Sequence, residues 1–310
     1  MTRLRLKPWY RVSIGDASVQ LRYAGSVLEL TGAAAARLLP RLLPLLDGTR
    51  TLDDLAAELG ESARPGIANA LEVLDSHGLL DDAPPPGLDP DLARTLEWLA
   101  ASDAYGRGTL DAWRSLAGRR VAVVGSSQVA SRVAELLGSV CALARCDWNE
   151  PEVHDVELVV VAPSSSEMQR LTEWNAAALE HESEWLQVLP FDGQLAAVGP
   201  IVVPHESACH ECYRLRRSAA ISPLADVAVG SYPSAPPVDS VLAGYAGLVA
   251  LRRLAFGDGA AVGTVLALEQ TPELSCSRHA VHRVPRCPAC SPAARRAVPS
   301  PWSGVHRVAA

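Results

Sequence analysis

The chain of 310 residues is 48% hydrophobic and carries a formal net charge of −7. This length and composition predict about two globular domains, each with its own core, and exclude a disordered protein. The acidic balance also makes nucleic acid an unfavourable partner. No basic and apolar leader opens the sequence, and no apolar run approaches the roughly 20 residues of a membrane span, so we expect a cytoplasmic protein without a membrane partner.

The first 23 residues are an exception to this acidity, because they hold five basic residues against one aspartate. An acidic peptide or nucleic acid would be attracted to such a patch, although a solvated basic strand explains it equally well.

Three segments near the start of the chain alternate in polarity as β-strands do, and Gly15–Asp16 and Gly25 separate them as turns. The segments predict a three-stranded antiparallel sheet, with strands at residues 11–14, 19–22 and 27–30.

Three helices are predicted after this sheet. The first covers residues 33–46, with Thr31 as its N-cap and with Pro40 and Pro44 expected to bend or break it. The second begins at a Thr51 capping box, and the third covers residues 65–76. A short strand is expected at Leu79–Leu80.

This order of elements describes a winged-helix module, residues 1–83. The stretch from Asp47 to Leu59, followed by a helix and by His77–Leu80, resembles the PqqD-like recognition domain of pathways for ribosomally made peptide natural products. The resemblance implies that the module binds the leader of a precursor peptide, which adds as a strand to the sheet edge beside the third helix. Such an edge offers unpaired backbone N–H and C=O groups.

The resemblance also implies which residues meet the peptide. The edge strand would be residues 26–30, the wall would be the flank of the third helix, and two arginines would pair with leader carboxylates. The implied contacts are Arg22, Ser26, Val27, Leu28, Glu29, Leu30, Arg64, Asn69, Ala70 and Val73.

Two alternatives remain open for this module. Val27 and Leu28 face opposite sides of a strand, so one of them belongs to the core whatever the module binds. A winged helix is also a common DNA reader, but the third helix has no lysine or arginine after Arg64 to meet phosphate.

A proline-rich break at residues 81–87 indicates a linker, and a helix is expected at 89–104, so residues 84–115 form a connecting segment. The second domain is expected over residues 116–310. Val121–Val124 reads as a buried strand that enters a glycine turn and a helix at 129–137. Further strands are predicted at 142–146, 156–161 and 186–191, which indicates a doubly wound α/β sheet.

The phosphate loop of this second domain is degenerate. Dinucleotide folds use G-x-G-x-x-G, but here only Gly125 is kept, since Ser127 and Ala130 occupy the other glycine positions. Lys7 is the only lysine in the chain and belongs to the first module. Asp147, at the end of the second strand, is a candidate for a ribose contact or simply a turn cap.

Four cysteines form two C-x-x-C pairs, Cys209/Cys212 and Cys287/Cys290. Four thiolates suit a tetrahedral zinc that leaves no position open for substrate, so the expected ion is structural. The pairs lie further apart than the roughly 15 to 20 residues typical of a compact zinc ribbon, so the ion would staple the ends of a folded segment.

The remaining cysteines, Cys141, Cys146 and Cys276, match no metal pattern and are expected to be small buried apolar residues. Two other clusters are expected to lie at the surface. The first has no nearby acid that could orient it and consists of Cys276, Arg278, His279 and His282. The second could bind an acidic partner or equally be a solvated helix face, and it consists of Arg214, Arg216 and Arg217.

Residues 118–291, with Val198–Pro204 and the two cysteine pairs, resemble the ThiF-like, ubiquitin-activating fold. Active members of that family adenylate a carboxylate with ATP and magnesium, using a lysine, an arginine and an aspartate. This chain has Ala162, Pro163 and Ser164 where the aspartate is expected.

A recognition module joined to such a domain resembles the ThiF-like partner protein of azoline-forming cyclodehydratases from thiopeptide and related pathways. The resemblance implies a non-catalytic subunit that binds zinc but not ATP and presents the precursor peptide to a YcaO-type cyclodehydratase. It also leaves a homodimer as an open expectation. The alternatives are an ATP-dependent adenylating enzyme that acts on the precursor and a DNA-binding regulator.

Overall fold

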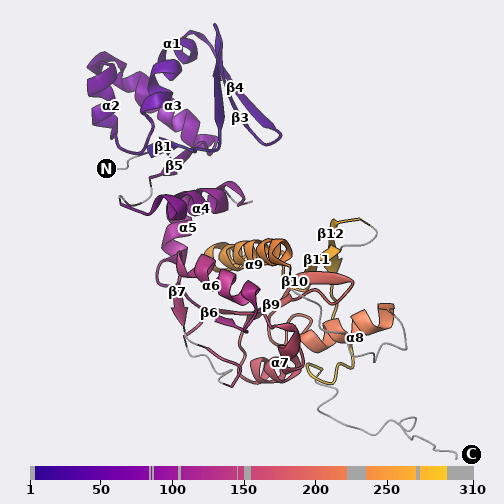
Figure 1. Ribbon diagram of the computed structural model, residues 1–310. Coiled ribbons are helices and arrows are strands. Elements are labelled where there is room, and N and C mark those ends of the chain that lie inside the picture. Colours follow the sequence, from indigo (N-terminus) through magenta and orange to yellow (C-terminus); the bar gives the residue numbers. More distant parts are fainter. Residues whose placement is uncertain are drawn as a thin grey trace, which may run out of the picture. The chain divides into compact units, whose positions relative to one another are not determined.

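The computed structural model describes residues 4–83, 85, 87–103, 106–144, 146–149, 155–221, 235–269 and 273–291 (Figure 1). The chain divides into two compact units, residues 1–117 and 118–310. The first unit therefore takes in the expected module 1–83 and the expected connecting segment 84–115. Whether residues 1–83 fold by themselves stays a prediction.

The first unit contains a three-stranded antiparallel sheet in the order β2–β3–β4. Its strands are β2 (Arg11–Ile14), β3 (Ser18–Tyr23) and β4 (Ser26–Thr31), each within one residue of the predicted bounds. A two-residue turn, in which Ala24 has a φ of 50°, joins β3 to β4, and such positive φ values are typical of tight hairpins. Val19 and Leu21 are fully buried on the core face of β3.

The predicted helices follow as α1 (Ala33–Leu42), α2 (Leu52–Leu59) and α3 (Arg64–Ser76), with short 3₁₀ segments at Leu43–Leu45 and Glu61–Ala63. The Thr51 capping box is confirmed, because Thr51 accepts the Asp54 N–H at 3.3 Å and Asp54 accepts the Thr51 N–H at 2.8 Å.

The N-cap and the end of the first predicted helix were wrong, whereas the expected break at Pro44 is confirmed. Thr31 is the last residue of β4, and Gly32 takes the N-cap position with a φ of 108°, which favours glycine. Pro40 lies inside α1, whereas the chain tightens into the 3₁₀ segment around Pro44. Pro44 has no N–H to continue the α-helical hydrogen bonding, so the α-helix ends before it.

Strand β1 (Leu4–Leu6) pairs antiparallel with β5 (Leu80–Asp82) in the same unit. The sequence indicated β5 but not its partner. Helices α4 (Pro90–Ala101) and α5 (Thr109–Leu116) complete the unit.

Arg5 on β1 ties these elements together. Its guanidinium donates to Glu97 at 2.8 Å, to the Thr109 hydroxyl at 2.8 Å and to Asp81 at 3.2 Å. The side chains of Arg5 and Asp81 are only 12% and 1% exposed, so this ion pair is a buried link between the two short strands. A chain cut at residue 83 would leave Asp81 without its bond from the Thr109 N–H and Arg5 without Glu97.

The second unit contains a seven-stranded mixed sheet among its described residues, in the order β12–β11–β10–β9–β8–β6–β7. Strands β7, β6, β8 and β9 are parallel to one another, and the pairs β9–β10, β10–β11 and β11–β12 are antiparallel. The strands are β6 (Arg120–Val124), β7 (Ala142–Ala144), β8 (Leu158–Val161), β9 (Trp185–Leu189), β10 (Leu195–Val202), β11 (Thr264–Glu269) and β12 (Ser275–Ala280).

Helices cover both faces of this sheet (Figure 1). Helices α6 (Gln128–Gly138) and α9 (Pro236–Phe256) pack together on one face, and α7 (Arg170–Glu180) and α8 (His210–Ile221) lie on the other. A short 3₁₀ segment, Ser165–Glu167, follows β8. Among the described residues, no helix has the length and apolar character needed to cross a membrane.

The expected α/β class with a central sheet is confirmed, as are the parallel strands that alternate with helices. Some predicted bounds were wrong: the strand at 142–146 ends at Ala144, and the helix at 89–104 ends at Ala101. Arg145, inside the first of these ranges, and Ala104, at the end of the second, lie outside the described residues. The antiparallel half of the sheet was not predicted.

Candidate functional site

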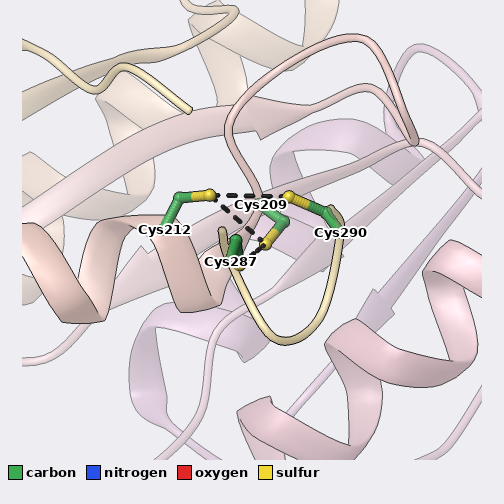
Figure 2. A group of neighbouring side chains, drawn as sticks. All are labelled: Cys209, Cys212, Cys287 and Cys290. Carbon is green, nitrogen blue, oxygen red and sulfur yellow. Dashed lines mark hydrogen bonds between the residues drawn. The ribbon is translucent and has the colours of Figure 1, made fainter. Parts of the chain in front are cut away.

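The four paired cysteines converge on one point, as Figure 2 shows. Their sulfur atoms all lie within 4.8 Å of one another, and the side chains are buried. Cys209 directly precedes α8 and Cys212 lies in its first turn, while Cys287 and Cys290 lie in the turns after β12. The sequence prediction that these two distant pairs form one cluster is confirmed.

The spacing of the sulfur atoms fits a tetrahedral metal site. The Sγ atom of Cys209 lies 3.8 Å from that of Cys212 and 3.7 Å from that of Cys287. The Sγ atoms of Cys212 and Cys290 lie 3.5 Å apart. Zinc–sulfur bonds of about 2.3 Å in a tetrahedron place neighbouring sulfurs about 3.8 Å apart. The four residues therefore have the ligand type, number and geometry to hold zinc.

The pKa values of these thiols indicate why a cation would stabilise the cluster. Burial raises the pKa of the Cys209 thiol and raises that of Cys290 to about 11. At Cys212 burial acts in the same direction, but hydrogen bonds led by the one from the Val284 N–H at 3.3 Å lower the pKa overall. A dication among the sulfurs would favour the thiolate at each position.

A buried polar network beside the cluster was not found from the sequence. His210 Nδ1 lies 2.9 Å from the Gln187 side-chain oxygen, Gln187 donates to the Gly199 carbonyl at 2.8 Å, and the Asn175 side chain accepts the His210 N–H at 3.0 Å. Burial lowers the pKa of His210 to about 4, so the imidazole is neutral at physiological pH. The network joins α8 to α7, β9 and β10, which is a structural role.

The predicted peptide-receiving strand is β4, and it lies at one edge of its sheet. Among the described residues it pairs only with β3. Leu28 and Leu30 are half-buried and pack on the core of the first unit, whereas Val27 is 58% exposed. Ser26 and Glu29 are also exposed. Of the two neighbours Val27 and Leu28, the second is the core residue.

The register of the hairpin shows which backbone groups of β4 are free of β3. The Gly15 N–H donates to the Ser18 carbonyl at 2.8 Å, so Ser18 directs its backbone groups toward β2. By alternation, Val19 and Leu21 direct theirs toward β4, where they face Leu30 and Leu28. The N–H and C=O groups that point to the open edge are therefore those of Val27, Glu29 and Thr31.

The predicted wall residues lie on α3 in the same unit. Asn69 is exposed, and Ala70 and Val73 are half-buried. Ala70 also packs against the core of the unit.

The two arginines expected at the peptide already have partners within the unit. Arg64 forms ion pairs with Glu61 at 2.6 Å and with Asp53 at 2.7 Å, and Arg22 donates to the Gln20 side chain. Arg64 would have to share its guanidinium with a peptide, while Arg22 has a neutral partner, Gln20, among the described residues.

The degenerate phosphate loop lies between β6 and α6, as predicted. Ser127 caps α6 by accepting the Ala130 N–H at 3.0 Å, and its hydroxyl donates to the Ala162 carbonyl at 2.7 Å. The Asp147 carboxylate accepts the N–H of Asn149 at 2.6 Å, so it caps a turn. Glu167, which the sequence analysis did not single out, reaches this loop and accepts the Ser126 N–H at 2.9 Å.

The remaining predicted clusters also have local partners. Arg214 pairs with Glu211, Arg217 with Asp192, and Arg216 donates to the His282 and Arg283 carbonyls. His279 lies near Glu269, at 3.7 Å, so the expectation that no acid is nearby was wrong. The antiparallel β11–β12 pairing, which was not predicted, brings them together.

The prediction of buried apolar cysteines holds for Cys141 alone. Cys146 is half-buried and Cys276 is exposed, because Cys276 lies on the edge strand β12.

No protein-family model matches this sequence, and no curated protein matches it significantly. Solved structures do share its fold. A heterocyclase in complex with substrate and cofactor aligns with a TM-score of 0.71 and 23% identity, over 94% of this chain and 40% of that chain. The heterocyclase TruD aligns with a TM-score of 0.69 and 22% identity, over 94% of this chain and 43% of that chain. The chain thus spans about two fifths of the heterocyclases that it resembles.

The fold also resembles MccB of E. coli. Its complex with MccA-N7isoASN aligns with a TM-score of 0.61 and 11% identity, over 94% of this chain and 99% of that chain. At these identities the likenesses establish a shared fold.

Proposed function

We propose that this protein is a non-catalytic subunit that binds the leader of a ribosomally made precursor peptide. It presents the precursor to a YcaO-type cyclodehydratase, which forms the azolines of a thiopeptide or related azole peptide. The contribution of the subunit is the effective concentration and orientation of the core peptide.

The open edge of β4 is the observation that carries the proposal. It presents the backbone N–H and C=O groups of Val27, Glu29 and Thr31 in one row, which an extended peptide can continue as a fourth strand. In this proposal the row belongs to a winged-helix recognition module of the PqqD-like type. Side chains at Asn69, Ala70 and Val73 would then select residues of the leader.

The fold likenesses support the same class of substrate. One solved neighbour is a heterocyclase in complex with substrate and cofactor, and another is MccB in complex with MccA-N7isoASN. The proposal extends the likeness of fold to the handling of a precursor peptide and leaves cyclodehydration to the YcaO-type partner.

The second unit is proposed to be a ThiF-like scaffold without adenylating activity. Adenylating members of that fold use a lysine at the phosphates and an aspartate for the metal ion. The sole lysine of this chain is Lys7, on the first unit, where it donates to the Gly106 carbonyl at 3.3 Å. Ala162 follows β8, where the aspartate is expected.

Zinc bound by the four cysteines has a structural role in this proposal. The ion would join the start of α8 to the loop after β12 and would have no open coordination position. All four sulfurs belong to the buried core of the second unit, beside Trp174 and Trp185.

The proposal is tested with the full chain, fluorescent leader peptides from precursors encoded beside the gene, and the neighbouring YcaO protein. We expect a rise in fluorescence anisotropy on binding. We also expect that adding this chain accelerates loss of one water per azoline, measured by mass spectrometry, with full-length precursor but not with leaderless core peptide. Equal rates with and without the chain would contradict the proposal.

The second candidate is an ATP-dependent adenylating enzyme that acts on the precursor. One observation favours it: the chain covers 99% of MccB, for which a complex with ATP is among the similar structures. Measurement of ATP–pyrophosphate exchange separates the two. A precursor-dependent exchange by the purified chain would support the enzyme, and background exchange alone would support the binding subunit.

A further inference from the structure

The turn between β6 and α6 is the place where folds of this type bind a nucleotide phosphate, because backbone N–H groups and a helix N-terminus meet there. A nucleotide can bind there only if the N–H groups of the turn are free to donate to its phosphate. In this chain an internal carboxylate already accepts one of these N–H groups.

Gly125 is required in this turn because it packs against the protein's own backbone and not because it approaches a ligand. Its φ is 128°, and a Cβ added to it would lie 2.1 Å from the Ala162 carbonyl oxygen. The turn after β6 is thus pressed against the residue that follows β8. The single glycine kept from the nucleotide fingerprint therefore has a structural reason to be there.

The Glu167 carboxylate lies beside this turn and is bonded to it. One of its oxygens accepts the N–H groups of Ser126 and Ser164, each at 2.9 Å, and the Ser164 hydroxyl at 3.0 Å. The other oxygen accepts the Trp148 indole N–H at 2.9 Å. A carboxylate with this set of donors resembles a bound phosphate in its charge and in its hydrogen bonding.

The loop that carries Trp148 is itself held in place over this carboxylate. Arg170 lies 5.2 Å from the centre of the Trp148 ring and donates to Asn149 at 2.8 Å, and Trp174 packs edge-on against the same indole at 6.0 Å. Burial alone would raise the pKa of Glu167. Hydrogen bonds, led by those from the Ser164 and Ser126 backbone, outweigh this effect and lower the pKa to about 2, so the group is an anion at physiological pH.

We propose that Glu167 is a built-in anion that occupies the nucleotide-phosphate position of the β6–α6 turn, so that the second unit is complete without a nucleotide and does not admit one. This inference does not depend on the peptide-binding role of the first unit. Glu167 then has a structural function in place of the lost nucleotide site. It stabilises the turn by accepting the Ser126 N–H, which would otherwise need a ligand.

The test compares Glu167→Gln with Glu173→Gln, which changes an exposed glutamate on α7. Thermal unfolding of the full chains should show E167Q melting about 3 to 8 °C lower than E173Q, because charged hydrogen bonds are lost at the turn only. Inorganic phosphate should raise the melting temperature of Glu167→Ala more than that of wild type or Glu173→Ala. Equal melting of E167Q and E173Q, or no selective effect of phosphate, would overturn the proposal.

A second measurement needs no variant and decides the matter if Glu167 variants do not fold. Wild-type chain is titrated with magnesium ATP, and the Ser126 amide and Trp148 indole signals are followed by NMR. We expect no saturable change at millimolar ATP. A saturable shift of these two signals would mean that ATP displaces the carboxylate, and the proposal would be wrong. Wherever E167Q folds, its leader affinity should equal that of wild type, which keeps this result separate from the peptide-binding proposal.

Discussion

Two places in the described part of this molecule differ in how their backbone N–H groups are bonded. At the edge of β4, the groups of Val27, Glu29 and Thr31 have no partner strand among the described residues. At the β6–α6 turn, the Ser126 N–H is bonded to the chain's own Glu167. An open row of donors and acceptors can accept a peptide, whereas a turn bonded to an internal carboxylate cannot accept a phosphate without displacing it.

The contrast suggests how one fold changes its role. Fold likeness alone would assign a nucleotide to the second unit, because that is where such folds bind one. On our proposal Glu167 satisfies a donor that a phosphate would otherwise take, and recognition belongs to the first unit, whose edge strand has no such internal partner among the described residues.

The largest expected effect is loss of zinc, which should unfold the second unit and leave the sheet of the first unit folded. Cys209→Ser or Cys287→Ser should lose zinc and unfold the second unit, because metal affinity and folding free energy are linked. Metal analysis and amide exchange of the full chain check this, with Cys276→Ser as the control because Cys276 is exposed and outside the cluster.

In these cysteine variants the β2–β3–β4 sheet should keep its amide protection if the chain stays soluble. Less than about half a zinc per native chain would contradict a closed four-cysteine site. Full zinc content in Cys209→Ser would contradict the assignment of the ligands.

A proline at the open edge tests the other side of the contrast. Val27→Pro removes a free-edge N–H but no bond to β3, and it should weaken leader binding by about ten- to a hundredfold, equivalent to about 1 to 3 kcal/mol. Glu29→Pro should act similarly, because the two residues share one direction. Anisotropy with a labelled leader measures both.

Val12→Pro is the matched control for the edge variants. Val12 lies on β2, where by the same alternation its N–H points to the opposite open edge. If Val12→Pro weakens leader binding as much as Val27→Pro, the peptide does not add to β4 alone, and the proposed position is wrong.

The contribution of Glu167 to the stability of the β6–α6 turn should also depend on pH. The folded-state pKa of Glu167 is lowered to about 2, below the unfolded value of about 4.3, so its stabilising contribution is complete above the unfolded value. It is lost as pH falls from about 5 toward 2. The difference in urea midpoint between wild type and E167Q should therefore shrink over that range, and a constant difference would contradict the role of the charge.

The smallest expected effects are those of charge beside the edge. Arg22→Glu should weaken an acidic leader by a few-fold at low salt and less at high salt, because exposed charges are screened. Arg64→Glu should change binding less than Arg22→Glu, since Arg64 is already paired with Glu61 and Asp53. An Arg64 effect larger than the Arg22 effect, in salt titrations of leader affinity, would contradict this order.

Several elements could be predicted from sequence because local rules govern them. Alternation gave the strands of the first sheet, the Thr51 capping box gave α2, and the paired cysteine spacing indicated one cluster, since each signal lies within a few residues. The antiparallel strands β10 to β12 were not predicted, and in β10 the reason is that every residue after Leu195 is buried, so its sequence shows no alternation of polarity.

Long-range contacts account for the rest. Glu167 is 41 residues from Ser126, and Arg5 is 92 residues from Glu97, so no local pattern connects them. The capping-box arrangement of Ser164 and Glu167 is a local signal that could have drawn attention to the acid. Its bond to the phosphate loop, however, depends on β6 and β8 being neighbours in the sheet.

Amide exchange of the full chain with and without its leader peptide tests the central claim most directly. Saturating leader should protect the amides of Val27 and Glu29, which point to the open edge, and should leave Val12 and Ile14 on β2 unchanged. Ser126 should stay unchanged as well, because its N–H is already bonded to Glu167. Leader binding that leaves Val27 and Glu29 exchanging at their free rates would contradict the account.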